Sequence, residues 1–155
     1  MPLQSKMNWF GVLLAVLLGI SAASGQTGGK AAGDRPARAY NPKATAAYAE
    51  VALRRAEMEA ELESLLLDYT DEYPRLKELR FSVGRIKAES ERLTAIPQDQ
   101  MEKATVALGK LVVRKIEAEV ELWKLQQSYA DGHPEVKRAK KRVDVFEAAI
   151  KEILG

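Results

Sequence analysis

Few side chains in this sequence have the types and spacing that catalysis or metal binding requires. There is one histidine, His133, and no cysteine, whereas a metal site needs several clustered histidine, cysteine or carboxylate ligands. Glutamates alternate from Glu57 to Glu63, but side chains two residues apart on a helix point in different directions and do not converge. We find no glycine-rich phosphate loop and no nucleophile beside a base. The sequence therefore predicts that the protein is not an enzyme and has no cofactor and no metal.

A motif that occurs twice, 60 residues apart, is the most specific pattern in the chain. Both copies have the form E-L-x-x-L-x-x-x-Y-x-D-x-(Tyr or His)-P-x-(Leu or Val)-K, around Pro74 and around Pro134. Proline disfavours helical geometry at the residue before it but suits the first turn of a new helix. Each copy therefore predicts a helical hairpin, with these residues at the turns: Tyr69, Asp71, Pro74, Tyr129, Asp131, His133 and Pro134.

The turn residues carry further expectations about local structure. Asp71 and Asp131 are expected to accept hydrogen bonds from backbone N–H groups, as short acids do in turns. Gly132 is expected to take the left-handed conformation that closes a helix. His133 occupies the position of Tyr73 in the first copy, and tyrosine has no acid–base role near neutral pH. We therefore expect His133 to be structural rather than a metal or proton ligand.

The segments before the turns contain apolar residues at heptad spacing, from Ala44 to Tyr69 and from Ala104 to Tyr129, which is typical of helices that pack along their length. Arg55 and Lys115 interrupt the two stripes at the same place. This repeated exception indicates a residue that sets register, a site opposite an acid, or simple inheritance from a duplication. A second stripe indicates helices buried on more than one side; its members are Leu53, Ala56, Ala60 and Leu67, and Val113, Ile116, Val120 and Trp123.

These patterns predict an all-α protein made of two tandem antiparallel hairpins, residues 43–95 and 96–155. An up-down-up-down four-helix bundle or coiled coil would bury both stripes, and closure of the second stripe between subunits is the alternative. Pro97 is expected to break the chain between the hairpins, and Asp99 to cap the helix that follows.

The first 25 residues have the plan of a secretory signal peptide: Lys6, an apolar run over 9–20, and small residues over 21–25. An uncleaved inner-membrane anchor over 9–23 is the alternative, although the run is shorter than the roughly 20 residues of a spanning helix. Residues 26–42 are rich in glycine, alanine and basic residues and predict a flexible basic linker. The chain is therefore expected to be exported, and periplasmic or secreted.

The densest charge run lies in the last predicted helix and contains Lys137, Arg138, Lys140, Lys141 and Arg142. These residues predict either a solvated face or a contact with an anionic glycan or membrane surface. A formal net charge of +2 and the lack of aromatic residues within the run argue against nucleic acid as a partner.

The two turn motifs, Tyr69 to Lys77 and Tyr129 to Lys137, resemble the hairpin turn of bacterial polysaccharide co-polymerases (chain-length determinants) and related exopolysaccharide exporters. Those proteins carry a similar Y-x-x-x-H-P-x-V-K turn in an extracytoplasmic coiled coil. The resemblance implies a scaffold or interaction protein of the cell envelope, linked to polysaccharide export, whose partner is a second copy or an envelope protein. The paired hairpins are also similar to periplasmic stress chaperones and heavy-metal sensors, which implies binding of unfolded clients as the alternative function.

Overall fold

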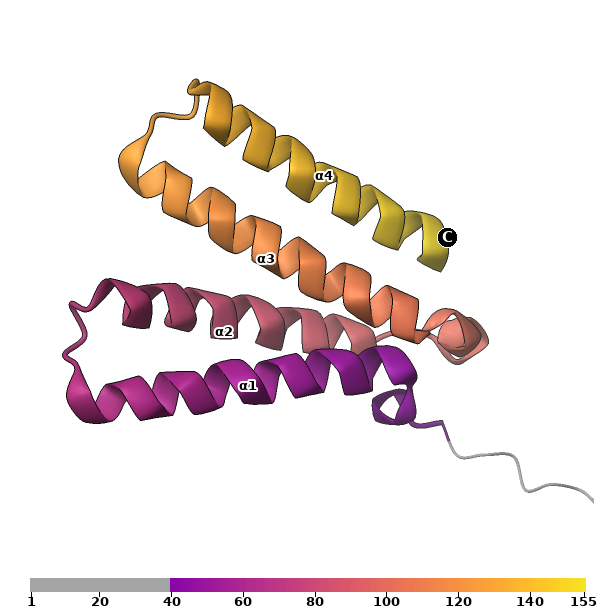
Figure 1. Cartoon of the computed structure of the whole chain (residues 1–155). Coiled ribbons are helices and arrows are strands. Elements are labelled where there is room, and N and C mark those ends of the chain that lie inside the picture. The colour runs from indigo at the N-terminus through magenta and orange to yellow at the C-terminus, as the bar shows by residue number, and fades with distance from the viewer. Residues whose placement is uncertain (1–39) are drawn as a thin grey trace, which may run out of the picture. The chain divides into compact units, whose positions relative to one another are not determined.

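The computed structural model describes residues 40–155, so the predicted signal peptide or anchor and most of the predicted linker lie outside the described residues. Over this range the chain is 84% helical and has no strand. Four long helices are present (Figure 1): α1 (Ala46–Asp68), α2 (Pro74–Thr94), α3 (Val106–Ser128) and α4 (Pro134–Leu154). Two 3₁₀ segments precede α1 and α3: η1 (Pro42–Ala44) and η2 (Gln98–Lys103). Between Tyr40 and Gly155, no helix is long and apolar enough to cross a membrane.

The starts of the helices follow from local sequence chemistry. Pro74 and Pro134 are the first residues of α2 and α4, as their fixed backbone angle favours. Thr45 and Thr105 cap α1 and α3, each side-chain oxygen accepting a hydrogen bond from the backbone N–H three residues on. The prediction that Asp99 caps the third helix is wrong, because Asp99 lies inside η2.

The ends of α1 and α3 are extended rather than left-handed. Tyr69 and Tyr129 follow the two helices with φ near −130° and ψ near 147°. Among residues 40–155, Gly155 alone has a positive φ, so the prediction for Gly132 is wrong. An extended residue directly after the helix already turns the chain, and no left-handed residue is required.

Helix α1 packs against α2, and α3 packs against α4, which gives the two predicted pairs, called hairpin 1 and hairpin 2 below. Helix α3 also packs against α1 and α2, whereas the principal contacts of α4 are with α3 and η2. The core is shared by both hairpins, and its largest fully buried side chains include Val51, Ile86, Leu108 and Ile116. Closure into a four-helix bundle or coiled coil is not established by these contacts and stays a prediction.

The second apolar stripe is buried in α3 but not in α1. Ile116 and Val120 belong to the core, and Val113 packs against it. In α1, Leu53 is 60% exposed and Leu67 is 85% exposed. The expectation of burial within one chain is therefore wrong for α1 in the described residues, because α2 and α3 both pack on other faces of this helix. Closure of the stripe between subunits stays a prediction.

Candidate functional site

The two hairpin tips are built in the same way. Each tip is a four-residue turn closed by a backbone hydrogen bond, from Tyr73 N–H to the Thr70 carbonyl at 3.0 Å and from His133 N–H to the Ala130 carbonyl at 2.9 Å. Proline begins the next helix directly after each turn. Helices α1 and α3 run in the same direction, so both tips lie at the same end of the described chain (Figure 1).

A pair of stacked rings covers each turn. The rings of Tyr69 and Tyr73 have centroids 4.1 Å apart with an interplanar angle of 13°. Those of Tyr129 and His133 are also 4.1 Å apart, with an angle of 20°. The imidazole thus takes the place of a phenol ring, and its Nδ1 accepts a hydrogen bond from the N–H of Glu135 at 3.3 Å. Tyr69 and Tyr129 remain about half exposed, so each tip presents a flat aromatic surface to solvent.

The aspartates of the tips bind side chains, not backbone. Asp71 accepts a hydrogen bond from Arg80, and Asp131 lies 3.0 Å from Lys140 Nζ, which is the same spacing of nine residues in both copies. Gln126 also donates to Asp131, at 3.1 Å. The expectation of backbone partners is therefore wrong, because a basic residue two turns into the following helix reaches each carboxylate. The hydrogen bonds from Lys140 and Gln126, with the charge of Lys140, hold the pKa of Asp131 below its ordinary value.

The basic run of α4 is only partly available to an external anion. Arg138 pairs with Glu135 at 2.6 Å, Lys140 pairs with Asp131, and Arg142 pairs with Glu121 of α3. Lys137 and Lys141 are exposed and have no acidic partner within 4.0 Å among residues 40–155. Among the five predicted contact residues, Lys140 and Arg142 therefore link α4 to the tip and to α3, Arg138 pairs within α4, and Lys137 and Lys141 face solvent alone.

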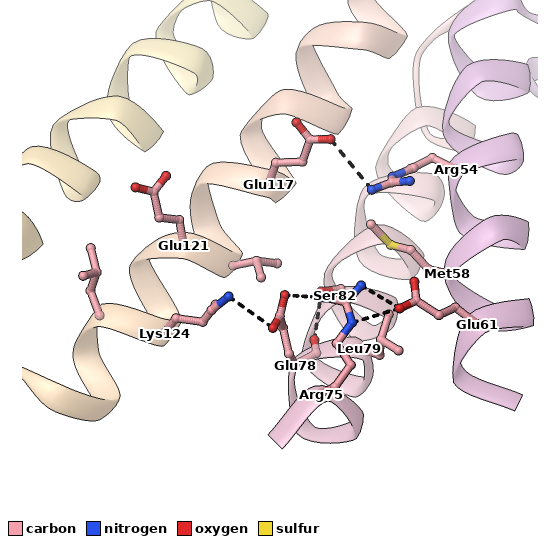
Figure 2. A pocket seen from close by; sticks show the side chains of 12 residues that line it. Arg54, Met58, Glu61, Arg75, Glu78, Leu79, Ser82, Glu117, Glu121 and Lys124 are labelled. Carbon is pink, nitrogen blue, oxygen red and sulfur yellow. Dashed lines mark hydrogen bonds and ion pairs between the residues drawn. The ribbon is translucent and has the colours of Figure 1, made fainter. Parts of the chain in front are cut away.

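A cleft of about 350 Å³ lies between the hairpins (Figure 2). Its floor is apolar, with Met58, Leu79 and Val120, and its walls carry charged side chains from α1, α2 and α3. Figure 2 shows Arg75 between two carboxylates, and its guanidinium lies 2.7 Å from both Glu61 and Glu78. The hydrogen bond to Glu61 is the main reason that the pKa of Arg75 is raised above its ordinary value. The charged side chains in the walls of the cleft therefore form ion pairs within the protein.

A buried ionic network also joins the two hairpins. Lys115 Nζ lies 2.8 Å from Glu89 and 3.7 Å from Glu119. Arg85 of α2 donates two hydrogen bonds to Glu119, at 2.7 and 2.6 Å, and the pKa of Arg85 is raised mainly by this bonding. Lys115 is therefore opposite an acid, as one of the sequence interpretations held. Arg55, its counterpart in α1, is half-buried and pairs at 3.7 Å with Glu59 of its own helix.

Sequence reasoning missed the cleft and the acidic partners of Lys115. The interrupted stripe marked Lys115, but Glu89 is 26 residues away and no motif connects the two. Across residues 40–155, no three histidine, cysteine or carboxylate side chains are placed to hold a metal ion.

Comparison with known proteins adds no relative. No family model, no curated protein and no solved structure matches this chain.

Proposed function

We propose that this chain is a non-enzymatic, exported scaffold or interaction protein of the bacterial cell envelope, and that it acts in polysaccharide export. The single observation that carries the proposal is the repeated tip: two turns of the same build, each with a stacked, half-exposed ring pair, at the same end of two hairpins. Exposed aromatic rings with polar edges are favoured at protein interfaces. Two such surfaces at the same end suit a partner that touches both tips.

The remaining features support a binding role. Wall charges in the cleft are paired within the protein, so the cleft offers no ready acid or base for a reaction. Lys137 and Lys141 provide two solvent-facing positive charges on α4, which suits a weak contact with an anionic glycan or membrane surface.

The proposal also covers the role of the N-terminal segment and the arrangement of the four helices. We propose that the N-terminal segment directs export or anchors the chain, and that the hairpins act as one up-down-up-down four-helix unit. The core shared by α1, α2 and α3 supports such a unit, because a shared core and a buried ionic network resist separation of the hairpins.

The test is complementation in the host. Deletion of the gene is expected to reduce or change the surface polysaccharide, and the wild-type gene is expected to restore it. The variant Tyr69→Ala/Tyr129→Ala should fold, as judged by far-UV circular dichroism, yet fail to restore the polysaccharide. A control variant, Leu67→Ala, alters an exposed residue beside the first tip and should restore it. An unchanged polysaccharide in the deletion strain would rule the proposal out.

A second function, binding of unfolded clients as a stress chaperone, is favoured by the exposed leucines near the first tip, Leu66 and Leu67. Unpartnered apolar side chains of this kind can hold unfolded segments. Suppression of the aggregation of a heat-denatured test protein, lost in Leu66→Ser/Leu67→Ser, would favour this function over the scaffold.

A further inference from the structure

The contact between the two hairpins includes an ion pair whose residues occur in both copies of the repeat. Arg54 of hairpin 1 reaches across to Glu117 of hairpin 2 at 3.9 Å and also pairs with Glu57 of its own helix at 3.0 Å. In the repeat, whose copies are 60 positions apart, Arg114 corresponds to Arg54 and Glu57 corresponds to Glu117. Arg114 pairs only with Glu117 of its own helix among the described residues, at 2.8 Å. The chain thus contains the two halves of a second such pair, on different hairpins.

These two halves face solvent. The side chain of Arg114 is 68% exposed and that of Glu57 is 52% exposed. Beside Glu57, α1 exposes Leu53, Ala56 and Ala60. They occupy the positions at which α3 uses Val113, Ile116 and Val120 to pack against hairpin 1. We call this surface of α1 the donor face. The corresponding surface of α3 already forms the contact with hairpin 1.

Hairpin 2 carries a surface that corresponds to the one receiving α3. On hairpin 1, Val51, Val83 and Ile86 are buried in the core shared with α3. Their counterparts on hairpin 2 are Leu111, Val143 and Phe146, which are only half-buried. A cavity of about 220 Å³ beside Phe146 is lined by Arg114 and Arg142, among others. We call this surface of hairpin 2 the acceptor face.

We propose that the chain self-associates head to tail, with the donor face of one copy packed on the acceptor face of the next and with Glu57 of one copy paired to Arg114 of its neighbour. This arrangement repeats between copies the contact that the two hairpins make within one copy. Such a contact uses two different surfaces, so it builds a ring or an open chain rather than a two-fold dimer. The inference rests on the proposed scaffold function only in taking a second copy as the protein partner.

Charge favours this pairing over contact between two donor faces. Glu57 and Glu59 flank the exposed apolar residues of α1, so two donor faces in contact would bring like charges together, which is destabilising. The acceptor face instead offers Arg114 and Arg142, which lie beside Glu117 and Glu121. Glu57 of a second copy would therefore meet the Arg114–Glu117 pair in the way that Glu117 meets the Arg54–Glu57 pair within one copy.

The contact between copies is weaker than the contact within one copy, for two reasons visible in the sequence. The residue that corresponds to Glu89, the partner of Lys115, is Ala149, so the buried ion pair is not repeated. Gly109 corresponds to Ala49, and a Cβ at Gly109 would lie 2.8 Å from the Ala47 carbonyl oxygen. Because α1 has Ala49 where α3 has Gly109, α1 cannot approach the acceptor face of a second copy as closely as α3 approaches hairpin 1. We therefore expect an assembly that depends on concentration and is not permanent.

The test is sedimentation velocity of the chain as its host processes it, over about 1 to 200 μM, a range set by the micromolar affinity of modest interfaces. The mean mass should rise with concentration beyond that of a dimer. Glu57→Arg and Arg114→Glu should each weaken association at least tenfold, and the combined variant Glu57→Arg/Arg114→Glu should restore it. The control is Glu135→Arg/Arg138→Glu, which likewise reverses one exposed acid and one exposed arginine, here both on α4, and should leave the mass unchanged.

A mixture of two variants tests the head-to-tail geometry itself. Leu53→Asp removes the donor face and keeps the acceptor face, whereas Arg114→Glu does the opposite. Each variant alone should remain monomeric, and an equimolar mixture should stop at dimers. A wild-type chain that stays monomeric at 200 μM, or an assembly insensitive to Arg114→Glu, overturns the proposal. Neither result affects the complementation assay of the tips, so the two proposals fail separately.

Discussion

Lys115 Nζ lies 2.8 Å from a carboxylate oxygen of Glu89, and the two residues are 3% and 5% exposed. They belong to different hairpins, because Lys115 is in α3 and Glu89 is in α2. Removing two charges from water is unfavourable unless geometry is good and the remaining groups are satisfied. Here Glu119 also approaches Lys115, and Arg92 donates to Glu89 at 3.0 Å. The charges are therefore matched only when the hairpins pack in this register.

Removal of one partner should be costly. Lys115→Ala leaves Glu89 buried without its closest cation, and we expect the free energy of unfolding to fall by about 3–5 kcal/mol, the range for breaking a buried pair. Replacement of both residues, Lys115→Met with Glu89→Leu, should recover most of this loss because no buried charge then remains. Urea unfolding followed by circular dichroism measures both values.

The repeat supplies the control for this prediction. Arg55 stands at the corresponding position of α1, but its side chain is 37% exposed and, among residues 40–155, it pairs only within its own helix. Arg55→Ala should therefore change the free energy of unfolding by less than about 1 kcal/mol, as for other exposed pairs. Equal losses at Lys115 and Arg55 would show that the ion pair between hairpins does not set the stability.

Two glycines inside helices should respond in opposite directions to alanine. Gly84 of α2 has no atom within 4 Å of the added Cβ, whereas Gly109 of α3 has the Ala47 carbonyl oxygen and the Glu50 Cβ at 2.8 Å. Gly84→Ala should stabilise the protein by about 0.5–1 kcal/mol through helix propensity. Gly109→Ala should destabilise it by about 1–3 kcal/mol despite the same propensity gain, since α1 and α3 must move apart.

Thermal unfolding of the two alanine variants shows directly whether each substitution stabilises or destabilises the protein. The melting temperature should rise for Gly84→Ala and fall for Gly109→Ala. A rise in both would mean that α1 and α3 do not approach closely at Gly109.

The parts of this fold that depend on local chemistry could be predicted from the sequence. Proline at the first helical position and a tyrosine five residues earlier mark both tips in the sequence, and the structure places Pro74 and Pro134 as expected. Heptad spacing predicts α1 and α3 to within a few residues of their observed bounds. The repeated interruption at Arg55 and Lys115 pointed to a special position, and one of the two became buried.

The parts that depend on tertiary contacts could not be predicted. Periodicity shows that a stripe such as Leu53 to Leu67 is apolar, but it does not show whether a neighbour covers it. The partner of Lys115 lies on another helix, and only packing brings Glu89 to it. The sequence does not show which partner the tip aspartates bind, because the reach of Arg80 and Lys140 depends on how each turn enters the following helix.

The stack between Phe81 and Trp123 is a further contact between α2 and α3, with centroids 5.1 Å apart and an interplanar angle of 14°. Phe81→Leu keeps most of the apolar area but removes the ring. We expect the free energy of unfolding to fall by about 0.5–1.5 kcal/mol, the value of an aromatic pair beyond its area. Chemical denaturation measures it. Tyr69→Leu removes an exposed tip stack instead and should cost less; a larger loss at Tyr69 would contradict the prediction.

Asp131 at the second tip should titrate below the ordinary range of an aspartate, because Lys140 and Gln126 bond its charged form. A pKa that is lower in the folded than in the unfolded chain means that the group stabilises the fold above the unfolded pKa, about 3.9, and that this stabilisation is lost as the pH falls through the folded value. Carboxyl-detected NMR titration of Asp131 should give the low midpoint, and Lys140→Met should move it upward. The neighbouring change Lys141→Met removes a charge that does not pair with Asp131 and should leave the midpoint nearly unchanged. If the midpoint is the same in wild type and Lys140→Met, the ion pair seen at the tip does not persist in solution.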